Sequence, residues 1–220
     1  MIMKNIKKSE PLNIRIVLDR SGSMADSKEI TIQALNTYLE DLKKESERPG
    51  FITLSTFDSW SIDIPITKVS LEEIAYFPEN ILLPRGRTPL YDAIGIAIYD
   101  LENIGESSDD SKVLVIVTDG LENASKEYSY DDVRKKIEEK EEAGWLIIYL
   151  GADHDAFNQS TSLGFNSVRS MKYSKEDSID AFKAVSRTTS EYRKGTNNKT
   201  IQFTEEERIS SDKANNKDDE

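Results

Sequence analysis

Short apolar runs alternate with longer amphipathic stretches along most of this chain. Such alternation is typical of a mostly parallel sheet covered by helices on both faces. Only Asp58 and Ser59 separate the second run from the third. That gap is too short for a parallel crossover, so the third strand is predicted to run antiparallel at the sheet edge. The predicted strands are Asn13–Leu18, Phe51–Phe57, Trp60–Ile66, Lys112–Thr118, Trp145–Leu150 and the weakly patterned Ser167–Met171.

The stretches between these runs carry apolar residues at helical spacing. The clearest one follows Pro89, where apolar residues recur from Leu90 to Leu101 at intervals of three and four, as expected for a helix with one buried face. We therefore predict a three-layer, Rossmann-like α/β fold around a sheet of about six strands. Further helices are predicted over Thr31–Leu42, Tyr130–Ala143 and Asp155–Ser162, and after a capping pair formed by Ser174 and Asp177.

The length of 220 residues fits one domain with a substantial core. We assign that domain to residues 11–195. Residues 1–10 are basic and polar and are expected to be flexible. Residues 196–220 read as a polar, acidic tail, because the last sixteen residues carry seven acids and three bases. A segment of this composition is expected to be disordered.

Charge and composition exclude several classes of function. The chain has 29 basic and 41 acidic residues and a net charge of -12, so it is expected to repel nucleic acid. It has no cysteine, which removes disulfides, thiolate zinc sites and cysteine nucleophiles. Its apolar runs are much shorter than the roughly 20 residues of a membrane span, and no secretory signal is evident. We therefore expect a cytoplasmic protein that does not enter a membrane.

Oxygen-bearing side chains follow two predicted strands and open one helix. Asp19, Ser21 and Ser23 leave the first strand, Asp119 ends the fourth, and Thr88 precedes a helix. Ligands bind beyond the carboxyl ends of parallel strands, where strand order reverses, so an order of 3-2-1-4-5-6 would bring these residues together. Two carboxylates and three hydroxyls suit Mg²⁺, with Mn²⁺ or Ca²⁺ as alternatives, and leave a coordination position open. Taken singly, each residue could instead be an ordinary turn or cap residue.

Together these residues resemble the metal-ion-dependent adhesion site of von Willebrand factor type A domains. The resemblance implies that the five side chains surround Mg²⁺, directly or through water, and that a glutamate or aspartate of a protein partner completes the shell. The family's usual role is protein binding rather than catalysis. The matching phrases are Asp19-Arg20-Ser21-Gly22-Ser23, Gly86-Arg87-Thr88-Pro89 and Thr118-Asp119-Gly120.

One position departs from the family's pattern. Many relatives carry two glycines before the threonine, whereas this chain has Gly86-Arg87. Arg87 is therefore a candidate rim residue that pairs with an acidic partner or points into solvent. The lack of cysteine favours the family's intracellular branch, and the composition rich in lysine, asparagine and isoleucine favours a bacterial or phage source. Domains of this type are often encoded beside an ATPase or a multiprotein complex, which are thus candidate partners.

Two other classes of function remain open from the sequence. A Mg²⁺-dependent phosphohydrolase would use Asp19 as nucleophile, but it needs a second aspartate two residues later, where this chain has Ser21. The glycine-rich Walker loop and the serine nucleophile elbow are also absent from the sequence. The third reading is a metal-independent structural protein that assembles through its edge strand or tail.

Several conspicuous residues are assigned structural roles. Asp92 lies one turn after the threonine and is left outside the site, although it could support a ligand. Asp58 is interpreted as a hairpin residue. His154 is the only histidine, and it has no evident partner for chemistry. Trp60 and Trp145 are interpreted as packing residues at strand starts.

Overall fold

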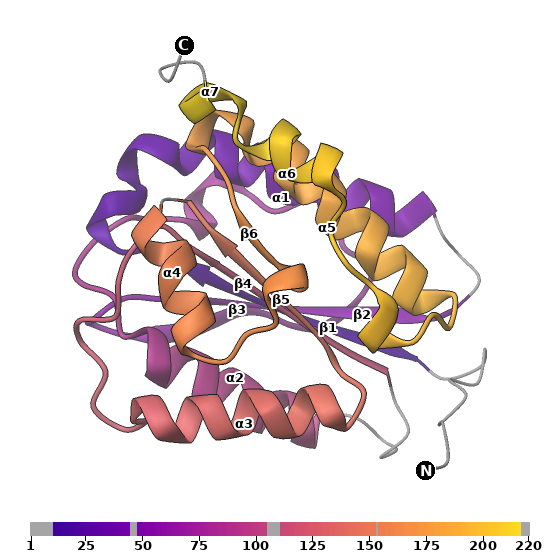
Figure 1. Ribbon diagram of the computed structural model, residues 1–220, viewed down its shortest axis with the longest axis horizontal. Helices are drawn as coiled ribbons and strands as arrows, with labels where there is room; N and C mark the ends of the chain where they lie inside the picture. The colour runs from indigo at the N-terminus through magenta and orange to yellow at the C-terminus, as the bar shows by residue number, and fades with distance from the viewer. Residues whose placement is uncertain (1–10, 45–47, 105–110, 153, 217–220) are drawn as a thin grey trace.

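The computed structural model describes residues 11–44, 48–104, 111–152 and 154–216 (Figure 1). The segment 1–10, which was predicted to be flexible, lies outside these ranges. Six strands form one sheet in the order β3-β2-β1-β4-β5-β6, which confirms the predicted topology. Within the described ranges, only β3 pairs antiparallel, and it lies at the edge. The strands are β1 Leu12–Asp19, β2 Gly50–Phe57, β3 Ile62–Ser70, β4 Ser111–Thr118, β5 Leu146–Gly151 and β6 Ser170–Lys172.

The central strands β1 and β4 are buried along their whole length. Strands covered on both faces need apolar side chains on both faces, which explains why their sequences do not alternate. The register pairs Leu18 with Val117 across β1 and β4. On the other side of β1, Asp19 pairs with Phe57 of β2. The carboxyl ends of the three strands therefore stand side by side.

Helices cover both faces of the sheet and produce the predicted three layers (Figure 1). One apolar core joins the sheet to α1 and α5, and a second joins it to α2 and α3. Among the described residues, no helix is long and apolar enough to cross a membrane. The helices are α1 Lys28–Lys44, α2 Leu90–Asn103, α3 Tyr130–Glu142, α4 His154–Ser162, α5 Ser178–Arg193, α6 Glu205–Ser211 and α7 Lys213–Asn216.

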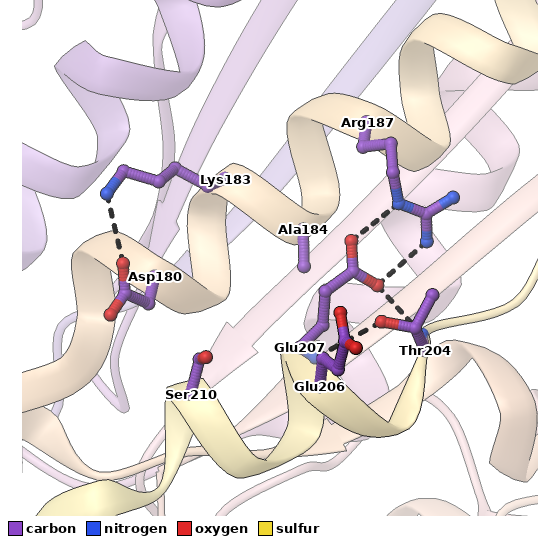
Figure 2. A pocket seen from close by; sticks show the side chains of 8 residues that line it. All are labelled: Asp180, Lys183, Ala184, Arg187, Thr204, Glu206, Glu207 and Ser210. Atoms are coloured by element: carbon purple, nitrogen blue, oxygen red, sulfur yellow. Dashed lines mark hydrogen bonds and ion pairs between the residues drawn. The ribbon is translucent and has the colours of Figure 1, made fainter.

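The structure differs from the sequence-based expectation over residues 196–216, which were assigned to a disordered tail. Ile201 and Phe203 are buried in the core beside α1 and α5. Thr204 and Glu207 form a capping box that starts α6. Arg187 of α5 binds the Glu207 carboxylate, with Nη2 2.8 Å from Oε2 (Figure 2). This segment contains few apolar residues, so its average composition indicates disorder even though two of them, Ile201 and Phe203, anchor it to the core.

The two tryptophans have different environments. Trp145 is 8% exposed and packs in the core, as predicted. Trp60 is 74% exposed, so its assignment as a packing residue is wrong. The reason is that β3 begins at Ile62, later than predicted, which leaves Trp60 in the turn of the hairpin. The guanidinium of Arg85 lies 5.0 Å from the ring centroid of Trp60.

Candidate metal centre

The site lies where the strand order reverses. β1 is followed along the chain by β2 on one side, whereas β4 lies on its other side. Connections that leave such neighbouring strands in opposite directions open a crevice above the sheet. Asp19 is the last residue of β1, and Asp119 directly follows β4. The fold thus brings to one edge two carboxylates that are 100 residues apart in sequence.

Four of the five predicted ligands are connected through hydrogen bonds. Asp19 is fully buried, and its Oδ1 accepts a hydrogen bond from the Ser21 amide at 2.7 Å. Ser21 Oγ lies 3.0 Å from Ser23 Oγ. Ser23 Oγ donates to Asp119 Oδ1 at 2.6 Å. Thr118 Oγ1 donates to Asp19 Oδ2 at 2.6 Å and so fixes the orientation of that carboxylate.

Thr88 joins the same cluster across Gly120. A Cβ atom placed on Gly120 would lie 2.9 Å from Thr88 Oγ1 and 3.6 Å from Asp19 Oδ2. The cluster therefore packs so closely against Gly120 that this position has no room for a side chain. The N-cap residue of α2 is Pro89, and the first-turn amides of Tyr91 and Asp92 donate to the side chains of Glu122 and Ser125, so the alternative role of Thr88 as a helix cap is not observed.

Burial raises the pKa of Asp19 to about 6, although hydrogen bonds from Thr118 and Ser21 oppose the shift and the charge of Asp119 adds to it. An ionised carboxylate in this place is costly unless a cation compensates it. Among the described residues, no group of three or more histidine, cysteine, aspartate or glutamate side chains surrounds a common point. Hydroxyls would therefore have to complete any coordination shell. Such an all-oxygen donor set fits a hard ion such as Mg²⁺.

The loop after Asp119 is tied to the start of α2 by residues that were not predicted to matter. Glu122 accepts hydrogen bonds from the amides of Ala124 and Ser125, and also from the Tyr91 amide at 2.9 Å. These contacts fix Asp119 and Thr88 relative to each other. The acidic and polar composition of the loop indicates a turn, but its partners lie about thirty residues away along the chain, which composition does not reveal.

Two further amide contacts complete this connection. Asn123 Oδ1 accepts from the Thr88 amide at 2.9 Å, and the Asn123 amide donates to the Thr88 carbonyl at 3.0 Å. Asp92 accepts hydrogen bonds from the amides of Lys126, Glu127 and Tyr128. Asp92 therefore holds the loop rather than contacting the oxygen cluster, in agreement with its exclusion from the site.

Asp58 is a hairpin residue, as predicted. Its Oδ1 accepts from the amides of Trp60 and Ser61, at 2.6 and 3.1 Å. Its Oδ2 binds Arg20 at 2.6 Å and Arg85 at 2.8 Å. Although burial acts to raise the pKa of Asp58, hydrogen bonds from Arg85, Trp60 and Arg20 lower it overall. The side chain of Arg20 thus binds the hairpin and is not part of the oxygen cluster.

The loop before Thr88 forms one side of the site. Gly86 has a φ of +68°, and a Cβ there would lie 2.7 Å from Ser59 Oγ, so this position requires glycine. Its carbonyl accepts from the Gly22 amide at 3.3 Å. The Arg87 amide donates to Ser59 Oγ, and the residue is exposed. Arg87 is therefore a solvent-exposed residue directly before Thr88, and its role at a partner-binding rim stays a prediction.

A cationic side chain that was not predicted also reaches the cluster. Lys175 Nζ lies 2.7 Å from Asp119 Oδ2 and donates to the Ser23 carbonyl at 3.0 Å. Lys175 lies shortly after β6, which is the last strand along the chain and forms one edge of the sheet. The side chain of His154, at the start of α4, lies outside the described part of the chain.

Two cavities lie outside the oxygen cluster. The first, of about 410 Å³, opens between α5 and α6, and four of its charged side chains form ion pairs, Lys183 with Asp180 and Arg187 with Glu207 (Figure 2). The second, of about 420 Å³, includes Leu121, two residues after Asp119, in its lining. The second cavity therefore shares a loop with the candidate metal centre.

Comparison with known proteins gives a family and a set of similar folds. The family model described as von Willebrand factor type A domain matches residues 13–187. No curated protein gives a significant match. The fold resembles proximal thread matrix protein 1 from the mussel byssus, with 16% identity, a TM-score of 0.58, and coverage of 80% of this chain but 47% of that one.

Two bacterial structures are also similar. The vWF domain of the type V pili tip protein Mfa5 from Porphyromonas gingivalis has 12% identity and a TM-score of 0.59, covering 89% of this chain and 98% of that one. The PilB minor pilin from Streptococcus sanguinis has 14% identity and a TM-score of 0.60, covering 83% and 62%. At such low identities, these likenesses concern the fold alone.

Proposed function

This chain belongs to the von Willebrand factor type A domain family, and from that premise we propose that it is a non-enzymatic, metal-dependent protein-binding module. The observation that carries the proposal is the convergence of oxygen donors from three segments at the point of strand-order reversal. The proposed ligands are Asp19, Ser21, Ser23, Thr88 and Asp119.

The donor set explains why Mg²⁺ is the proposed ion, with Mn²⁺ or Ca²⁺ as substitutes. When bound, the ion would supply a positive centre able to accept a carboxylate from a glutamate or aspartate of a partner protein. Asp19 and Asp119 provide two negative charges to balance it, and three hydroxyls add no charge. The cluster opens at Ser23, which is exposed, whereas Asp19 is buried beneath. A partner would therefore approach from the side of Ser23.

The rim supports a protein as the partner. Trp60 and Leu121 are exposed apolar residues in loops adjoining the cluster, and Arg87 adds a positive charge. Exposed aromatic and arginine side chains are frequent at protein-binding surfaces. An ATPase or a multiprotein complex is our proposed class of partner.

The test compares metal binding and partner capture in matched variants. Mn²⁺ binding would be followed by the electron paramagnetic resonance of free Mn²⁺ for wild type, Asp19→Ala and Asp26→Ala. Asp26 is an exposed acid in the same part of the chain and serves as the control. We expect Asp19→Ala to lose more than about a hundredfold in affinity and Asp26→Ala to bind as wild type.

Partner capture from the native lysate would then be compared in Mg²⁺, in EDTA and with Asp19→Ala. We expect capture only by metal-loaded wild type. Recovery of the same partners in all three conditions would exclude the metal bridge and favour the structural alternative. Turnover of p-nitrophenyl phosphate in Mg²⁺ that is lost in Asp19→Ala would instead favour the phosphohydrolase.

A further inference from the structure

Lys175 already places a positive charge within the proposed metal site. Its Nζ lies 2.7 Å from Asp119 Oδ2 and 3.0 Å from the Ser23 carbonyl oxygen. The Asp119 side chain is 1% exposed, and that of Lys175 is 32% exposed. The ion pair therefore has a buried acidic half and a basic half that reaches in from solvent.

The backbone under Lys175 is held firmly in place. Lys175 opens a 3-10 turn, Lys175–Asp177, in which Ser174 Oγ donates to Asp177 Oδ2 at 2.6 Å. The same carboxylate oxygen accepts from the Ala214 amide at 2.9 Å. Ser178 Oγ donates to the Lys175 carbonyl at 2.6 Å. These bonds fix the position of the Cα atom, so the flexible part is the four-carbon side chain.

Asp119 cannot serve a divalent ion and an ammonium group in the same way at once. Two cations that share one carboxylate repel each other, and the repulsion is strong where the carboxylate is shielded from water. A lysine side chain on a fixed backbone can, however, swing its ammonium group into solvent. Asp119 can therefore pair with the ammonium group of Lys175 or with a divalent ion, but not with both in the same way.

We propose that Lys175 is the resident cation of this site, that a divalent ion binds only by displacing its ammonium group from Asp119, and that Lys175 thereby sets the ion affinity. This inference rests on the proposed metal-binding function. Lys175 compensates the buried Asp119 charge when the divalent ion is scarce. The site then changes occupant in response to ion concentration without passing through a state in which Asp119 is unpaired.

The first test measures Mn²⁺ affinity in lysine variants. Lys175→Met removes the competing charge and should bind Mn²⁺ about tenfold more tightly than wild type, the equivalent of one partly buried ion pair. Lys175→Arg keeps a cation and should stay close to wild type. Lys183 forms a similar pair with Asp180, at 3.0 Å, on the exposed side of α5. Lys183→Met should therefore change affinity by less than about twofold.

The second test uses the wild-type chain, so it does not depend on how a variant folds. Lysines would be labelled with an acylating reagent in EDTA and in saturating Mg²⁺, and the extent at each site measured by mass spectrometry. We expect Mg²⁺ to increase labelling of Lys175 several-fold relative to Lys183, because the displaced ammonium group becomes accessible.

The outcomes separate this inference from the function on which it rests. Equal Mn²⁺ affinity in wild type and Lys175→Met, with unchanged labelling, would overturn the role of Lys175 and leave the metal site intact. Failure of all variants to bind Mn²⁺ would overturn both proposals. Binding that is detectable only in Lys175→Met would support Lys175 as the dominant occupant.

Discussion

Gly120 is the position where the two sides of the oxygen cluster meet. An added methyl group there would lie 2.9 Å from Thr88 Oγ1, closer than carbon and oxygen normally approach. Its φ is outside the left-handed range, so alanine adds no backbone strain. We expect Gly120→Ala to displace Thr88 and weaken Mn²⁺ binding by at least about tenfold, with little change in unfolding free energy.

The matched control for this substitution is Gly22→Ala. Its Cβ would have its nearest neighbour, the Gly86 carbonyl oxygen, at 3.6 Å, an ordinary contact. Titration calorimetry with Mn²⁺ and urea unfolding would be run on both variants. Wild-type affinity in Gly120→Ala would mean that Thr88 does not contribute to the site.

The sequence identified the proposed metal ligands better than it identified the residues that hold these ligands in position. Asp19, Ser21, Ser23 and Asp119 follow from a general rule about strand ends, and the structure brings them together. Lys175 was missed because its contact with Asp119 spans 56 residues and involves a type of side chain that is usually solvated. No local pattern specifies such a pair. Whether the cluster binds metal stays a prediction.

The C-terminal segment depends on a few apolar anchors. Phe203 is 4% exposed and belongs to the core shared by the sheet, α1 and α5, whereas Ile209 of α6 is 53% exposed. We expect Phe203→Ala to lower the unfolding free energy by about 3 kcal/mol. Ile209→Ala should change it by less than about 0.5 kcal/mol. Urea unfolding of the two variants provides the measurement, and equal midpoints would show that the segment does not stabilise the domain.

Strand and helix types were predictable where periodicity was strong, as in α2 and β4. The boundaries of elements were less predictable, since β3 begins two residues later than predicted and extends to Ser70.

The prediction of a disordered C-terminal segment was wrong for a different reason. Its charges dominate the composition, whereas Arg187 and the capping pair of Thr204 and Glu207 use those same charges to dock α6 on α5. Partners determine whether a charged segment packs.

Over the whole domain, the stability of the metal-free protein should depend on the ionisation of Asp19. Because burial raises the pKa of Asp19 to about 6, folding favours its protonated form. Its contribution is full below about pH 4 and is lost as pH rises through 6. We expect Asp19→Asn to be more stable than wild type at pH 7 in EDTA, by roughly 1–3 kcal/mol. The difference should vanish near pH 4.

Urea unfolding between pH 4 and 8 would measure this effect. In saturating Mg²⁺ at pH 7 the order should reverse, because only the wild-type carboxylate can bind the ion. Asp132 supplies an internal contrast, since hydrogen bonds from Ser129 lower its pKa, so Asp132→Asn should lose stability above pH 4. A stability of Asp19→Asn that tracks wild type at every pH would contradict the raised pKa.

The topology of the sheet was the most predictable property of the molecule. Alternating strand and helix patterns, together with the short gap at Asp58 and Ser59, predicted the mostly parallel sheet and its antiparallel edge, and the observed strand order is the one that the site hypothesis required. Topology alone then placed the site, because strand order reverses at only one point between β1 and β4. The loops above that point were not predictable, since their form depends on contacts between segments far apart in sequence, such as Glu122 with Tyr91.

The contrast between the two tryptophans gives the domain an intrinsic optical probe. Trp145 is enclosed and Trp60 is solvated beside Gly86, one residue from Arg87 at the rim. Their fluorescence should therefore separate by wavelength, with the solvated indole emitting further to the red. Collecting emission on the red side of the spectrum would favour the indole that stands at the proposed docking surface. Binding at the rim can thus be followed in the unlabelled chain.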